Sequence, residues 1–157
     1  MEKLTICLWF DGNGEEAARF YVDLFAESSI DSITRSPADY PAGKEGDVLT
    51  VNFTLADRSF LALNGGPFTA FNEAISLSID CEDQAEVDRY WAALSHHPEK
   101  EQCGWVKDKF GLSWQIVPRR LPELLSGPDA AKAKRVMEAM MSMKKIDVAE
   151  LEQAAAG

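Results

Sequence analysis

Histidine and cysteine, the side chains most often found in metal and nucleophilic sites, are scarce in this chain. It contains two histidines and three cysteines. The histidines, His96 and His97, are adjacent in a polar run, so they lack the helical or strand spacing of a ligand pair, and we expect them in a solvated loop. The cysteines are Cys7, Cys81 and Cys103. Their number is odd, and no two of them form a C-x-x-C pair. This usage is typical of a reducing compartment, so the expected location is the cytoplasm.

Basic residues and long apolar runs are also few. Lys and Arg total 16 against 26 Asp and Glu, and the formal charge of −10 argues against nucleic acid or an anionic membrane as a partner. No apolar stretch reaches the length of a membrane span, and no basic and apolar leader precedes Leu4. A phosphate-binding glycine loop is missing, since Asn64-Gly65-Gly66 matches neither G-x-G-x-x-G nor G-K-[ST]. We expect no cofactor.

What the chain does contain is a pattern that occurs twice. A strand is followed by a helix start at Asn13 with Glu16, and again at Asp83 with Glu86, each pair typical of a capping box. The apolar helix faces recur at the same offset: Ala17, Phe20, Tyr21 and Leu24, then Val87, Tyr90, Trp91 and Leu94. Caps and faces together indicate an internal duplication.

Each copy is predicted to contain a strand, a helix and three further strands. The first copy has strands at 28–35, 48–55 and 58–64, with a mobile loop over 37–47, and the first long strand of the second copy is shortened near 97–102. The fold class is therefore α+β, with two βαβββ modules forming a curved, mostly antiparallel sheet around a cleft, plus C-terminal helices. We expect one domain over 1–157, with modules at about 1–67 and 70–118 and the helices at about 120–156.

The C-terminal segment shows its own helix signals. Pro128 suits the first helical position, and a second helix opens at Asp147, with Ile146 against Leu151 as a hydrophobic staple. Between them runs an apolar stripe: Ala133, Val136, Met137, Met140 and Met141. The apolar stripe and the unpaired strand edges would be exposed to water in one chain alone, so we predict a homodimer that buries them. The alternative is a monomer whose stripe folds back on its own sheet.

One stretch, 104–118, reads as a β-hairpin. Residues 105–107 form one arm, Gly111 supplies the turn residue that can take a positive φ, and 112–117 form the second arm, which ends at Pro118. Alternation places Leu112, Trp114 and Ile116 on one face and Ser113, Gln115 and Val117 on the other. We expect Lys107, Asp108 and Lys109 to flank the turn in an exposed position.

This hairpin resembles the closing hairpin of the PhnB-like branch of the glyoxalase/bleomycin resistance/dioxygenase (vicinal oxygen chelate) superfamily. From Cys103 to Pro118 the chain follows the form C-G-W-x-K-D-K-[FY]-G-x-S-W-Q-I-x-P. The resemblance extends from Leu4–Phe10 to Met140–Asp147 and implies the same paired modules and a dimer. The branch often carries the label 3-demethylubiquinone-9 3-methyltransferase-like. The sequence does not support that activity, since 9–14 is not the glycine-rich loop of a usual methyltransferase.

In metal-dependent members, the resemblance implies, each module gives a metal one ligand from its first strand and one from its last. Those positions fall here on Thr5 or Ile6, Ala74, 61–63 and Gln115. Only Gln115 carries a ligand atom, and one neutral amide cannot hold a divalent ion that needs three or four donors. We therefore predict no metal site.

Strand alternation predicts which side chains face the cleft. Ile6, Leu8 and Phe10, with Ile75, Leu77 and Ile79, are expected under the helices, and Thr5, Cys7, Trp9, Ala74, Ser76 and Ser78 toward the cleft. The candidate ligand-binding residues are Gln115, Cys7, Trp9, Ser76, Ser78 and Trp105, and no catalytic residue is assigned. Cys7 lacks a histidine to activate it, and the tryptophans could equally be core, which is the better assignment for Trp114.

Three functions are compatible with the sequence. The first is a metal-free protein that binds a small molecule in a neutral, aromatic-bordered cleft. The alternative is an enzyme on a small oxygenated substrate, with Gln115, Ser76 and Ser78 polarising a carbonyl. A third is a structural or partner-binding protein with a filled cleft. Fold-level resemblance cannot choose a reaction, because this scaffold hosts many.

Overall fold

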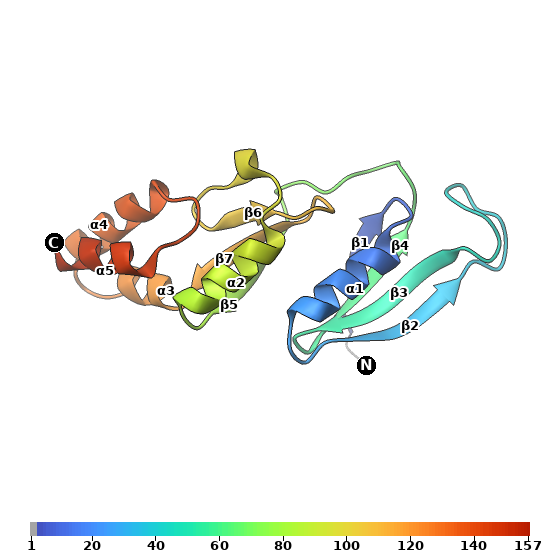
Figure 1. Cartoon of the computed structure of the whole chain (residues 1–157), viewed down its shortest axis with the longest axis horizontal. Helices are drawn as coiled ribbons and strands as arrows, with labels where there is room; N and C mark the ends of the chain where they lie inside the picture. Colours follow the sequence, from blue (N-terminus) through green and yellow to red (C-terminus); the bar gives the residue numbers. More distant parts are fainter. Residues whose placement is uncertain (1–2) are drawn as a thin grey trace. The chain divides into compact units, whose positions relative to one another are not determined.

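The computed structural model describes residues 3–157 and divides into two compact units, Met1–Phe71 and Asn72–Gly157. The first unit pairs one helix, and the second unit several, with one small sheet each, which confirms the α+β class (Figure 1). Both sheets are mixed, because in each of them the first strand pairs with the last in parallel, and the other three strand pairings are antiparallel as predicted. In the described part of the chain, no helix is long and apolar enough to cross a membrane.

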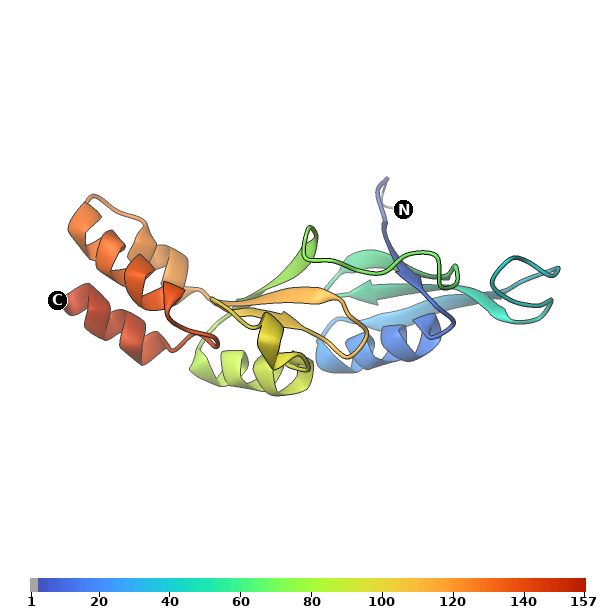
Figure 2. The ribbon, with the colours of Figure 1, turned by 90° about the horizontal axis from the view of Figure 1, so that it is seen from above.

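The first unit follows the predicted strand–helix–three-strand order. Its elements are β1 (Ile6–Phe10), α1 (Gly14–Leu24), β2 (Ser29–Arg35), β3 (Val48–Leu55) and β4 (Arg58–Asn64), with sheet order β1-β4-β3-β2. Helix α1 covers one face of this sheet (Figure 2), where the inward side chains are buried: Leu8, Phe10, Val51, Phe53, Phe60 and Ala62. The tight turn at Ala56-Asp57 is confirmed, with φ of 45° and 63°. Ile6 is 41% exposed, contrary to prediction, because β1 is an edge strand.

The start of α1 differs from the prediction. Asn13 occupies the N-cap position but makes no side-chain capping bond. Instead, Asn64 at the end of β4 accepts a hydrogen bond from the Gly14 amide at 2.8 Å, and its own amide donates to the Val48 carbonyl at 2.9 Å. A buried residue from a neighbouring strand thus caps the helix and links it to the sheet.

The second unit repeats this plan with one strand fewer among the described residues. It contains β5 (Ser76–Cys81), α2 (Gln84–Leu94), a 3₁₀ turn (Pro98–Lys100), β6 (Trp105–Lys107) and β7 (Ser113–Pro118), with order β5-β7-β6. Helix α2 lies on one face of the sheet (Figure 2). The segment predicted as a shortened strand is this 3₁₀ turn, since Pro98 has no amide for a ladder. β5 begins at Ser76, so Ile75 lies outside it and is 69% exposed, contrary to prediction.

The capping signal at α2 is confirmed. The Asp83 carboxylate accepts a hydrogen bond from the Glu86 amide at 2.9 Å, and the Glu86 carboxylate accepts one from the Glu82 amide at 2.7 Å. α1 and α2 occupy Gly14–Leu24 and Gln84–Leu94, so the two helices match in length and in the constant sequence offset that indicated a duplication.

The turn of the β6–β7 hairpin contradicts one expectation. Asp108 is fully buried instead of exposed. Its carboxylate accepts hydrogen bonds from the amides of Phe110 (2.8 Å) and Leu112 (3.0 Å) and from the Trp114 indole (2.8 Å). The chain folds around this carboxylate because it accepts hydrogen bonds from three donors that would otherwise be buried without a partner. Trp114 is core, as predicted.

The C-terminal helices form a small core of their own. They are α3 (Arg120–Leu125), α4 (Ala130–Met141) and α5 (Val148–Ala156). Asp129 caps α4, so Pro128 precedes the cap and is not the first helical residue as predicted. The predicted staple is present, since Ile146 and Leu151 are both fully buried in one cluster.

The apolar stripe on α4 has two different environments. Val136 is fully buried in the C-terminal cluster and Met140 packs against it. Met137 and Met141 are 40% and 53% exposed. Part of the stripe therefore folds back within the second unit, and part stays on its surface.

Candidate ligand-binding face

The sheet of the second unit has one apolar and one polar side. Toward α2 lie the buried side chains Ile79, Val106, Trp114 and Ile116. The opposite side, which we call the polar face, carries two cross-strand rows, Ser78–Gln115–Trp105 and Ser76–Ser113–Lys107. Residues in one row are directly opposite on neighbouring strands, so their side chains are neighbours. This register brings together four of the predicted site residues: Gln115, Ser76, Ser78 and Trp105.

Gln115 is the centre of this face. Its amide nitrogen donates to the Ser76 hydroxyl at 2.9 Å, a contact between half-buried side chains of β7 and β5. Within residues 3–157, this is the one hydrogen bond made by the Gln115 side chain. An amide carries two acceptor lone pairs and two donor hydrogens, so the carbonyl oxygen and one N–H are available to a ligand.

Ser113 lies on the same face, as strand alternation predicts, and it is a further candidate beside the six predicted site residues. It is 1% exposed, and its hydroxyl oxygen makes no hydrogen bond in the described part of the chain. A buried hydroxyl normally has a partner, because desolvation without one costs free energy. In the sequence, Ser113 could have been recognised as a candidate because it is a small polar residue two positions from Gln115, in a strand that is apolar at the alternate positions.

Charge reaches the polar face through Lys107 of β6. Its ammonium group lies 3.5 Å from a carboxylate oxygen of Glu73, and Lys100 lies 3.3 Å from the same oxygen. The pKa of Glu73 is held below its usual range by its own backbone N–H, and further by Lys100 and Lys107. Lys107 is half-buried, whereas Lys109 on the other side of the turn is exposed.

Cys7 and Trp9, the remaining predicted site residues, belong to β1 of the first unit. They lie opposite Leu61 and Leu63 on the sheet face that α1 does not cover. Cys7 is exposed, yet its surroundings exclude enough water to raise the pKa of the thiol, which keeps it protonated at neutral pH. A protonated thiol is a poor nucleophile.

Trp9 is occupied in holding the chain after β4. Its indole N–H donates to the Gly66 carbonyl at 2.8 Å. The ring lies against Gly65, where an added Cβ would be 2.2 Å from Trp9 Cζ2. Gly65 is therefore required by a close approach, and the indole N–H is not available to a ligand.

The positions at which the superfamily places metal ligands do not fit a metal ion here. Ala74 and the aliphatic residues 61–63 offer no donor, and Gln115 is bonded to Ser76. At the remaining position, Thr5 offers only an exposed neutral hydroxyl and Ile6 only hydrocarbon. Across residues 3–157, no three His, Cys, Asp or Glu side chains converge in a way that could hold an ion. A divalent cation needs several charged or imidazole donors.

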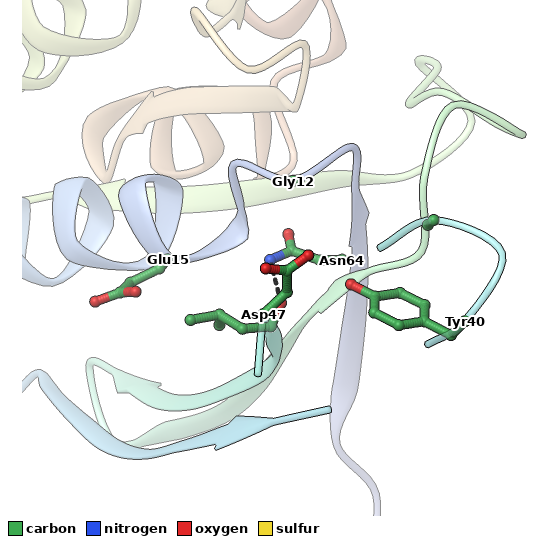
Figure 3. Close-up of a pocket in the computed structure, with 7 residues that line it drawn as sticks. Gly12, Glu15, Tyr40, Asp47 and Asn64 are labelled. Atoms are coloured by element: carbon green, nitrogen blue, oxygen red, sulfur yellow. Dashed lines mark hydrogen bonds between the residues drawn. The ribbon is translucent and has the colours of Figure 1, made fainter. Parts of the chain in front are cut away.

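A pocket that the sequence did not indicate lies in the first unit. Its volume is about 250 Å³, and it is lined by Gly12, Glu15, Tyr40, Ala42, Asp47, Val48 and Asn64. Figure 3 shows Tyr40, Asp47 and Asn64 around this hollow. Most of its polar groups already have partners. Glu15 pairs with Arg19, Asp47 accepts from the Lys44 amide, and Asn64 uses both ends of its amide. The polar face, by contrast, presents groups without partners.

Comparison with known proteins agrees with this architecture. A family model described as 3-demethylubiquinone-9 3-methyltransferase matches residues 2–117. A solved PhnB protein from Bacillus cereus, described under the same methyltransferase name, is 35% identical, with a TM-score of 0.63 over 74% of this chain and 99% of that chain. The protein PA1353 from Pseudomonas aeruginosa is 18% identical, with a TM-score of 0.58 over 75% and 98%. A lactoylglutathione lyase from Agrobacterium tumefaciens has a TM-score of 0.38 at 16% identity over 75% and 95%, too low to carry an argument. No curated protein matches the chain.

The duplicated strand–helix–strand units, each with its first and last strands parallel, define a protein of the glyoxalase superfamily. Within that superfamily, the chain belongs to the PhnB-like 3-demethylubiquinone-9 3-methyltransferase family.

Proposed function

We propose that this protein binds a small oxygenated molecule, without a metal ion, on the polar face of its second unit. The observation that carries the proposal is the half-satisfied amide of Gln115, which is held by Ser76 and flanked in its row by Ser78 and Trp105. A few convergent polar groups beside an aromatic ring are typical of small-molecule sites. One neutral amide, Gln115, is too little to hold a divalent ion, which favours direct hydrogen bonding to the ligand over coordination by a metal.

A second candidate function uses the same residues for catalysis. In it, the free N–H of Gln115 and the hydroxyls of Ser76 and Ser78 donate to a substrate carbonyl and stabilise negative charge that develops on its oxygen. The fixed position of the amide favours this role, since a preorganised donor does not have to reorient during the reaction.

Methyl transfer, the activity in the family's name, is not part of the proposal. A methyltransferase of the usual kind has a doubly wound parallel sheet with a glycine-rich loop after its first strand. In residues 3–157 the sheets are two small mixed ones, and the turn after β1 leads into a helix capped by Asn64.

We further propose that the chain forms a homodimer and works in the cytoplasm. The exposed Met137 and Met141 on α4 support an interface, because large apolar side chains on one helix face favour burial. All three cysteines are free thiols, which suits a reducing compartment.

The binding proposal is tested by comparing two glutamine variants. A library of small carbonyl and hydroxyl compounds is screened against the unchanged protein by ligand-observed NMR. Compounds that bind are then titrated against Gln115→Ala and against Gln153→Ala, whose exposed glutamine lies on α5. We expect Gln115→Ala to weaken binding about tenfold and Gln153→Ala to leave it unchanged. Equal affinity for both variants contradicts the proposal, and stoichiometric binding of nickel or zinc in a calorimetric titration contradicts its metal-free form.

A further inference from the structure

The second row of the polar face combines features that point to one chemical group. Ser113 lies at its centre on β7, directly opposite Ser76 on β5 and Lys107 on β6. Side chains that carry one cation and two hydroxyls are therefore neighbours on three adjacent strands. Since all three backbones are held in strand ladders, the arrangement does not depend on a flexible loop.

The Ser113 hydroxyl is the independent observation. It is removed from water and makes no hydrogen bond within residues 3–157. Its neighbour Ser76 already accepts a hydrogen bond from Gln115, so the Ser76 proton remains free to be donated elsewhere. The row thus offers two hydroxyl donors to an acceptor that the chain itself does not supply.

The Lys107 ammonium group is also incompletely used. Its contact with Glu73, at 3.5 Å, is longer than a direct charge-assisted hydrogen bond, and Glu73 shares the same oxygen with Lys100. The pair nevertheless shows that a carboxylate can approach this lysine. A carboxylate has two oxygens and one negative charge, which suits one ammonium group and two hydroxyls. A phosphate group, with more charge and more acceptors, is usually bound by arginines or a series of backbone amides, which this row lacks.

We propose that the row Ser76–Ser113–Lys107 binds the carboxylate of a small oxo acid whose carbonyl reaches Gln115. This rests on the proposed function, because it assigns a ligand class to the same face. The Cα atoms of Ser113 and Gln115, two residues apart in β7, are separated by about 6–7 Å, so the two polar groups of the ligand lie within a few bonds of each other.

The test uses pyruvate, 4-oxopentanoate and 5-oxohexanoate, each paired with its methyl ester, titrated into the full chain and followed by protein NMR. The ester keeps the skeleton and the carbonyl but removes the charge. We expect at least one acid to bind about tenfold more tightly than its ester, as for a charge-assisted hydrogen bond. Lys107→Met should remove that difference, and Lys109→Met, the exposed lysine across the turn, should keep it.

Ser113→Ala provides a readout that separates a ligand group from a structural one. Because the hydroxyl has no partner in the free protein, its removal should raise the melting temperature while weakening the acid several-fold. A lower melting temperature, with acid binding unchanged, overturns the role of Ser113. Equal binding of acid and ester in a Gln115-dependent manner overturns the carboxylate site and leaves the proposed function standing. If none of the acids or esters binds and other library compounds do, the carboxylate proposal is also wrong, and if no compound binds at Gln115, both proposals are wrong.

Discussion

Replacing Asp108 by alanine should destabilise the second unit strongly. The buried carboxylate accepts three hydrogen bonds of 2.8, 3.0 and 2.8 Å, two from backbone amides of the turn and one from the Trp114 indole. A hydrogen bond to a charged group contributes about 1.5–3 kcal/mol, and each buried donor left without a partner costs about 1–3 kcal/mol. Because such terms are not additive, we expect a total loss of about 3–5 kcal/mol in the free energy of unfolding.

The assay is urea unfolding followed by tryptophan fluorescence, in which Trp91, Trp105 and Trp114 report on the second unit. A loss of this size corresponds to a fall in melting temperature on the order of 10 °C. Asp23→Ala, at an exposed position on α1, is the matched control and should change the free energy of unfolding by less than about 0.5 kcal/mol.

Two further variants sharpen this prediction. Asp108→Asn keeps an acceptor for the turn amides but presents an N–H₂ group to the Trp114 indole N–H, so two donors face each other. Combining it with Trp114→Phe removes the conflict and should recover part of the stability lost in the single variant. If Asp108→Ala is as stable as Asp23→Ala, the turn does not depend on the buried carboxylate, and the reasoning is refuted.

Four other outcomes are expected. Asn64→Ala should lower the free energy of unfolding by about 1–2 kcal/mol, because the first amide of α1 loses its cap. Asn13→Ala should have almost no effect. Equal losses of stability in thermal unfolding would show that Asn13 caps the helix. Burial raises the pKa of the Cys81 thiol from 9.0 to about 12, so the stability that the protonated thiol contributes is complete below pH 9 and is lost as the pH rises through the folded pKa. In urea titrations, the difference in free energy of unfolding between the unchanged protein and Cys81→Ala should therefore shrink over that range. A difference that stays constant with pH would contradict the prediction. Glu73→Gln should tighten the binding of oxo acids several-fold in the NMR titration, because a competing carboxylate leaves Lys107, and weaker binding would mean that Glu73 positions the lysine. Light scattering at micromolar concentration should give twice the mass of one chain, with Met137→Glu reducing it, and a mass near 17.4 kDa for the unchanged protein would refute the dimer.

Local features of the fold could be predicted from the sequence. The bounds of β3 and β4 and the turn between them agree with the prediction, because alternating side chains and a two-residue turn are properties of neighbouring residues. The constant offset between α1 and α2 is likewise a property of the chain alone. On the polar face, alternation correctly placed Gln115 opposite the apolar side of β7.

Other features were decided by contacts between distant segments. Asn64 caps α1 in place of Asn13 because the parallel pairing of β1 and β4 brings the end of β4 to the start of the helix, a proximity that no local pattern encodes. Asp108 looked exposed because a charged residue in a turn usually is, and its burial follows from the position of the Trp114 indole across the hairpin. Val136 is buried, and Met137 beside it is not, because only one side of α4 faces the C-terminal cluster.

The candidate site shows the same division. The residue types were visible in the sequence, and strand alternation gave the face on which each lies. What alternation cannot give is the register between strands, since a shift of one residue would place every side chain on the other face. The observed register aligns Ser113 with Ser76 and Lys107, and burial then deprives its hydroxyl of water without supplying a partner. The sequence therefore determined which functional groups the polar face carries, and the tertiary structure decided how they are arranged.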